Sequence, residues 1–89
     1  MFYIVMATVN PGITIDDVQR ALAGMQWYRI APNVWVVYSW MRADDLFNRL
    51  HYLTNPGGSL LISRLDWTDR QGFMPPAFWN WARALGAPV

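Results

Sequence analysis

The sequence predicts an α+β domain in which one four-stranded antiparallel sheet carries two helices on one face. Two observations lead to this fold class. Four short segments have the apolar, β-branched and aromatic composition of strands, and two segments between them repeat apolar residues at helical spacing. The 89 residues are enough for a single domain. We expect a ferredoxin-sized core over residues 1–67 and a C-terminal extension over residues 68–89.

The first half of the chain contains a strand, a helix and a hairpin. Residues 2–9 are continuously apolar, which is typical of a central strand covered on both faces. Thr14 is a favourable N-cap for a helix that we expect over residues 15–24. An aromatic β-hairpin follows over residues 26–39, and its second strand is expected over residues 34–38.

The second half adds a helix, a strand and the extension. Apolar residues at helical spacing predict a helix over residues 43–53, and turn residues then lead to a strand over residues 59–67. The order strand, helix, strand, strand, helix, strand is that of ferredoxin-like βαββαβ folds. The extension is expected to form a loop, with room for a short fifth strand, and then a short helix over residues 77–85.

The composition predicts more apolar surface than one small core can cover. Hydrophobic residues make up 54% of the chain and aromatic residues 16%, with six tryptophans. This excess predicts an exposed apolar patch, and its simplest occupant is a second copy of the chain. The residues expected at the homodimer interface are Trp27, Trp35, Tyr38, Phe73, Trp79 and Trp81.

The charges are few and nearly balanced. All seven basic residues are arginines, all six acidic residues are aspartates, and the net charge is +1. This balance argues against strong nonspecific binding of nucleic acid, which needs many phosphate contacts. Local contacts with nucleic acid are still expected, because guanidinium groups suit phosphate and because Trp27 and Arg29 share one strand face. The candidate residues are Arg20, Arg29, Arg64 and Arg70.

The chain has no cysteine, which excludes a disulfide framework and thiolate metal sites. The apolar segment at the N-terminus is too short to span a bilayer, so no membrane association is expected. We expect a cytoplasmic protein that needs no metal and no cofactor.

Five segments carry a resemblance to a known family, namely residues 2–8, 34–39, 43–50, 60–65 and 72–81. In this order and spacing, they resemble small ferredoxin-fold proteins similar to the second, DNA-positioning subunit of the CRISPR spacer-integration complex, including SinR-like stand-alone relatives. The resemblance implies a DNA-positioning scaffold that forms a symmetric dimer. It also implies that the two sheets meet face to face and that the segment after the fourth strand pairs with the partner's sheet edge.

The chain departs from the nuclease-active relatives in that family. Their activity is attributed to an aspartate at the end of the first strand, where this sequence has Ala7, Thr8 and Val9. No catalytic residue is therefore expected. Two alternatives remain open, namely a metal-dependent nuclease that uses Asp66 and Asp69, and an inhibitor or adaptor from a mobile element that binds a host protein.

Overall fold

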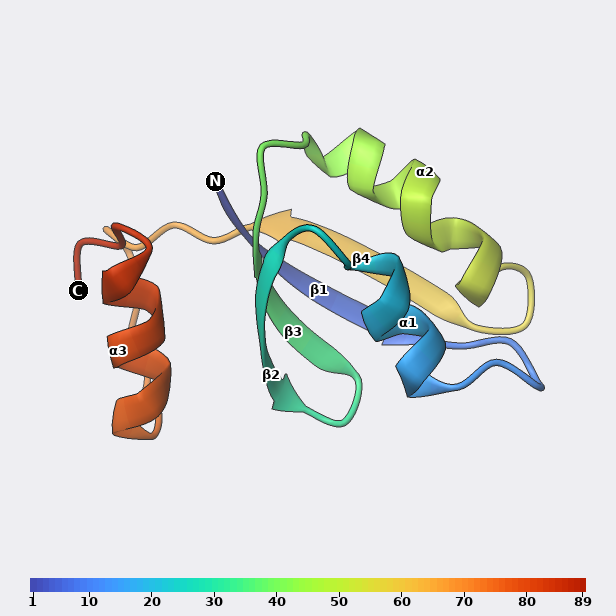
Figure 1. Ribbon diagram of the computed structural model, residues 1–89, viewed down its shortest axis with the longest axis horizontal. Coiled ribbons are helices and arrows are strands. Elements are labelled where there is room, and N and C mark those ends of the chain that lie inside the picture. The colour runs from blue at the N-terminus through green and yellow to red at the C-terminus, as the bar shows by residue number, and fades with distance from the viewer.

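A computed structural model describes all residues from 1 to 89 and contains four strands and three helices (Figure 1). None of the helices is long and apolar enough to cross a membrane. In chain order, the elements are β1 (Phe2–Thr8), α1 (Ile15–Ala21), β2 (Gln26–Ala31), β3 (Val34–Tyr38), α2 (Ala43–Thr54), β4 (Ser59–Arg64) and α3 (Pro76–Ala84).

The four strands form one antiparallel sheet in the order β2-β3-β1-β4. The α+β class and the four-stranded antiparallel sheet are thus confirmed. β1 pairs with β3 on one side and with β4 on the other, so it is a central strand, as its almost continuously apolar sequence predicts. β2 and β4 are the outer strands, and each leaves one edge without a partner strand.

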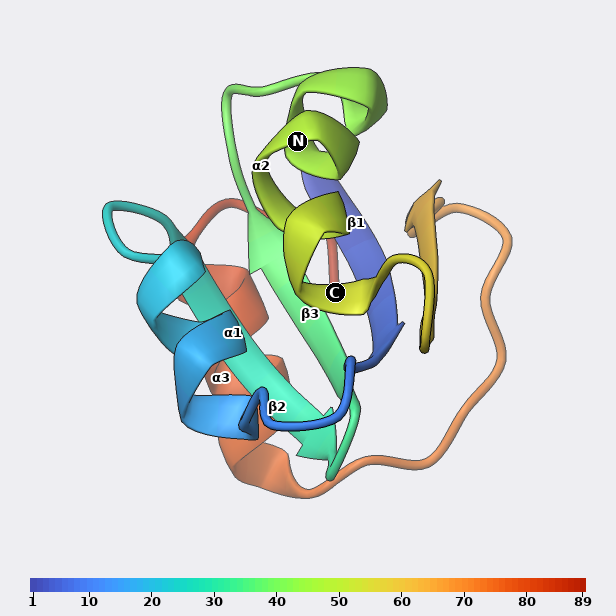
Figure 2. The same cartoon turned by 90° about the vertical axis from the view of Figure 1, so that its right-hand side faces the viewer.

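The first hydrophobic core lies between the sheet and the helices α1 and α2, which share one face of the sheet (Figure 2). Alternate residues of the central strands point into it, because successive side chains of a strand face opposite sides. The apolar faces of α1 and α2 complete this core, as the helical spacing of apolar residues in the sequence predicts. Its fully buried members include Val5, Val18, Leu22, Trp35, Val37, Leu46 and Leu50.

A second hydrophobic core lies on the opposite face of the sheet, where the C-terminal extension folds back and α3 packs behind the strands (Figure 2). Phe78 and Ala82 of α3 are buried there together with Phe2 and Val36 of the sheet. Trp67 joins them, with its ring centroid 5.2 Å from that of Phe2 in an edge-to-face arrangement. The fold therefore has three layers, and much of the aromatic excess is buried within one chain.

Two boundaries differ by three residues from those that the sequence predicts, and the other differences are of one residue. α1 ends at Ala21 instead of residue 24, because the chain turns before Gly24, whose positive φ of 87° lies outside the right-handed helical region. β4 ends at Arg64 instead of residue 67, because Trp67 turns into the second core. The loop that follows Trp67 contains no strand.

Candidate functional site

Three of the six predicted interface residues help to hold α3 on the sheet. Tyr38, Trp79 and Trp81 are half-buried and pack against the second core. The ring of Trp81 lies 5.6 Å from that of Tyr28, and the indole Nε1 of Trp79 donates a hydrogen bond to the Met74 carbonyl at 3.2 Å. The structure thus places these three side chains together, in contacts within the same chain.

The other three predicted interface residues lie apart from that group. Trp35 is 0% exposed in the first core, so its side chain has no surface to offer a partner. Trp27 is half-buried against the same core. Phe73, in the loop before α3, is 98% exposed and is the one predicted residue whose whole side chain faces solvent.

The four candidate arginines lie on four different parts of the chain, and three have partners within it. Arg20 forms an ion pair with Asp17 on α1. Arg29 donates to the carbonyls of Ala31 and Pro32, at 3.2 and 2.6 Å. Its guanidinium also lies 5.9 Å from the ring of Trp35, the cross-strand neighbour of Arg29 on β3.

The remaining two candidates, Arg64 and Arg70, precede and follow Trp67 in the sequence. Arg70 donates to the Trp67 carbonyl at 2.6 Å, and its guanidinium stacks 5.6 Å from the ring of Trp79. Arg64, at the end of β4, is exposed and makes no hydrogen bond or ion pair. Arg64 is therefore the candidate whose guanidinium is most available to a phosphate.

The carboxylates of the nuclease alternative are not arranged as a metal site. Asp66 Oδ1 accepts hydrogen bonds from the hydroxyl and the backbone N–H of Thr68, at 2.6 and 2.9 Å. These two bonds hold the pKa of Asp66 below its usual value of 3.8. No three histidine or aspartate side chains gather closely enough to hold a metal ion. The geometry describes an Asx turn that shapes the loop after β4.

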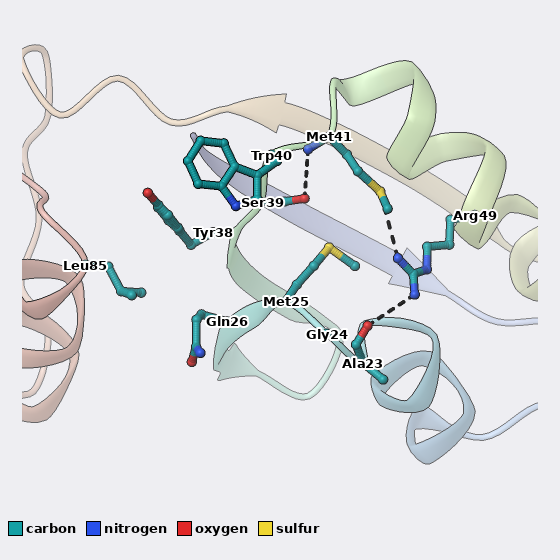
Figure 3. A pocket seen from close by; sticks show the side chains of 10 residues that line it. All are labelled: Ala23, Gly24, Met25, Gln26, Tyr38, Ser39, Trp40, Met41, Arg49 and Leu85. Carbon is teal, nitrogen blue, oxygen red and sulfur yellow. Dashed lines mark hydrogen bonds between the residues drawn. The ribbon is translucent and has the colours of Figure 1, made fainter.

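A groove of about 440 Å³ opens at the end of the sheet where β2 begins and β3 ends, between the turn after α1, the segment before α2 and Leu85 after α3 (Figure 3). Met25, Gln26 and the exposed ring of Trp40 line it. Arg49 of α2 lines the groove and donates to the Ala23 carbonyl at 3.1 Å, which links α2 to the turn after α1. The hydroxyl of Ser39 accepts the backbone N–H of Met41 at 3.0 Å. These groups offer contact surface, and neither a histidine nor an aspartate lines the groove as a base for Ser39.

A further exposed apolar surface lies beside β4, and none of its residues is among those that the sequence predicts at an interface. Leu61 on β4 and its neighbour Met6 on β1 are 60% and 43% exposed, on the sheet face that carries α3. Phe47 of α2 is 42% exposed on the other face and stacks on His51, with ring centroids 5.2 Å apart. The apolar residues of β1 and β4 give no sign in the sequence that Met6 and Leu61 stay exposed. We name Met6, Phe47 and Leu61 the β4-edge surface.

Comparisons of the chain with protein-family models, with curated proteins and with solved structures found no match. Its function is therefore inferred from its own residues and geometry.

Proposed function

We propose that this chain is a ferredoxin-like module that forms a homodimer and acts as a non-catalytic scaffold. Support for the ferredoxin-like topology comes from the element order and from the strand order β2-β3-β1-β4, in which β1 and β3 take the central positions. The lack of a carboxylate at the end of β1 supports the non-catalytic role, because Thr8 and Val9 cannot bind a hard cation through ionised oxygens.

The observation that carries the homodimer is the apolar surface that remains after α3 has covered its part of the sheet. The β4-edge surface and Phe73 leave large apolar side chains in water. Burial of apolar area contributes roughly 25 cal/mol per Å², so a partner that covers these side chains gains free energy. A second copy is the partner always present at equal concentration.

The scaffold role that we assign is that of a cytoplasmic, DNA-positioning protein similar to the CRISPR integration subunit. It is supported by the sequence resemblance and by the unpaired guanidinium of Arg64. A dimer presents two such groups, one from each copy, and this doubling suits a scaffold that contacts a duplex at two places.

Light scattering during size-exclusion chromatography tests the homodimer. At micromolar concentration we expect a mass near twice the chain mass of 10.3 kDa. A mass that stays at 10.3 kDa up to the highest concentration reached would contradict the proposal.

Fluorescence anisotropy with a labelled DNA duplex at low salt tests the contact with nucleic acid. We expect Arg64→Ala to weaken binding several-fold, because it removes a phosphate contact. Arg20→Ala is the matched control, since Arg20 is engaged by Asp17. If the unchanged protein binds no DNA at low salt, the nucleic-acid part of the proposal fails while the homodimer stands.

A further inference from the structure

The outer edge of β4 carries backbone groups without a partner strand. The N–H of Ser59 donates to Thr8 Oγ1 at 2.8 Å, and the N–H of Leu65 donates to the Phe2 carbonyl at 2.9 Å, so both point toward β1. Backbone groups of an antiparallel strand alternate in direction along the chain. The N–H and C=O groups of Leu60 and Ile62 therefore point away from the sheet, where no strand receives them.

The two outer strands of the sheet differ in how well they are protected. β2 has a register irregularity between Arg29 and Ala31, and the Arg29 side chain covers the carbonyl of Ala31. Bulges and charged side chains of this kind prevent an edge from pairing with another chain. β4 has no bulge and no proline, and its one charged residue is its last, Arg64. β4 is thus the edge that is open to another strand.

The sequence of β4 indicates which strand fits this edge. Residues 59–63 read Ser-Leu-Leu-Ile-Ser. Their pattern of polar and aliphatic residues is therefore the same when it is read in either direction from Leu61. A second copy placed antiparallel about Leu61 puts Leu60 opposite Ile62 and a serine opposite a serine. The outward N–H and C=O groups of Leu60 and Ile62 then face one another, as a hydrogen-bonded pair requires. A pairing centred on Ile62 would instead set Leu60 against Arg64.

Exposed apolar side chains lie beside this edge on both faces of the sheet. On the α3 face, Leu61 would meet its own copy across the two-fold axis of that pairing, and Met6 lies next to Leu61 in the sheet register. On the other face, Arg49 donates from one flank of α2 to the Ala23 carbonyl, just after α1. Phe47 lies on the opposite flank by helical spacing, toward the β4 edge. Figure 2 shows α2 over the β1 and β4 half of the sheet and α1 over the other half.

We propose that two copies of this chain pair through β4, antiparallel and centred on Leu61, to form one continuous sheet. This inference rests on the proposed homodimer and specifies its interface. It differs from a face-to-face contact between sheets, because α3 already covers part of the face that such a contact would use.

The absence of cysteine makes a direct test available. A pair of residues on the axis at a position without hydrogen bonds has Cα atoms about 4.5 Å apart, within the range of disulfides. Under mild oxidation, we expect Leu61→Cys to form a covalent dimer. Ser59→Cys is the matched control on the same strand, and its two copies lie too far apart to join. Crosslinking of Ser59→Cys and not of Leu61→Cys would overturn the proposed register.

A second pair of variants tests the interface without oxidation. Leu61→Arg sets two like charges against each other on the axis, and we expect the dimer dissociation constant to rise at least tenfold with unchanged circular dichroism. Tyr52→Arg is the control, since Tyr52 is similarly exposed at 62% but faces solvent on α2. A dimer that neither crosslinks at Leu61 nor weakens with Leu61→Arg would refute pairing through β4 and leave the proposed function intact. A monomeric protein would refute both.

Discussion

Gly58 is the residue at which the fold tolerates least change. It lies between α2 and β4, beside the end of β1, and a Cβ atom there would come within 1.8 Å of the Thr8 carbonyl oxygen. Backbone cannot move aside as a flexible side chain would, so the position accepts no side chain without a shift of the strands.

We expect Gly58→Ala to lower the free energy of unfolding by at least about 2 kcal/mol, because overpacking against backbone forces the strands apart. Urea denaturation followed by circular dichroism measures the change. Gly72→Ala serves as the control, since nothing lies within 4 Å of its added Cβ, and its effect should stay within about 0.5 kcal/mol. Equal stability of the two variants would show that β1 does not approach Gly58 so closely.

Asp17 and Asp66 are expected to make the free energy of unfolding depend on pH in acid solution. The pKa of Asp17 is lowered from 3.8, first by the backbone N–H of Thr14 and then by Arg20, and that of Asp66 is lowered mainly by the Thr68 hydroxyl. A carboxyl whose folded pKa is depressed stabilises the fold fully above its unfolded pKa. That contribution is lost as the pH falls below 3.8 and through the folded pKa.

The double variant Asp17→Asn with Asp66→Asn should therefore unfold at a lower urea concentration than the unchanged protein at pH 7. The difference should shrink as the pH falls below 3.8 and through the folded pKa values, because the carboxyls of the unchanged protein then become protonated as well. Asp69→Asn is the control, because the Asp69 carboxylate makes no hydrogen bond or ion pair. A difference that persists undiminished in acid would assign the effect to something other than ionisation.

At the scale of elements, α3 is the part whose role the sequence could not reveal. Its helical spacing and its stop at Gly86 predict the helix to within a residue at each end. The helical spacing does not show which surface the apolar face of α3 packs against. Burial within a chain and burial between chains give the same composition, so the sequence predicts Trp79 and Trp81 at an interface without showing that they also pack against the second core of their own chain.

The packing of α3 is tested with two phenylalanines of opposite exposure. Phe78 is buried among Tyr28, Trp67 and Trp81, so Phe78→Ala should cost about 3–5 kcal/mol of unfolding free energy. Phe73 is exposed, and Phe73→Ala should change stability by less than about 0.5 kcal/mol. Thermal and urea denaturation measure both. A small cost at Phe78 would mean that α3 does not pack on this sheet.

At the scale of the whole molecule, the sequence predicted the strands, the helices and an apolar excess, but not where that excess reaches the surface. Alternation shows that Trp35 and Val36 face opposite sides of β3, yet it does not show what covers either side. The β4-edge surface became visible only when the strand order placed β4 at an edge and the helices left Leu61 and Phe47 uncovered.

The same placement links the fold to the proposed function. Joining two copies through β4 covers the surface that the layers of one chain leave open, and it sets the two Arg64 side chains near the ends of the paired strands. The scaffold is thus a property of the dimer, since one chain offers a single unpaired guanidinium from β4.

Hydrogen exchange at the backbone amides of β4, resolved by NMR, tests the dimer most directly. The amides of Leu61 and Ser63 point toward β1 and should exchange slowly at every protein concentration. The amides of Leu60 and Ile62 should exchange rapidly in dilute protein and at least about tenfold more slowly in concentrated, dimeric protein. If Leu60 and Ile62 exchange rapidly in protein that light scattering shows to be dimeric, the two copies do not pair through β4.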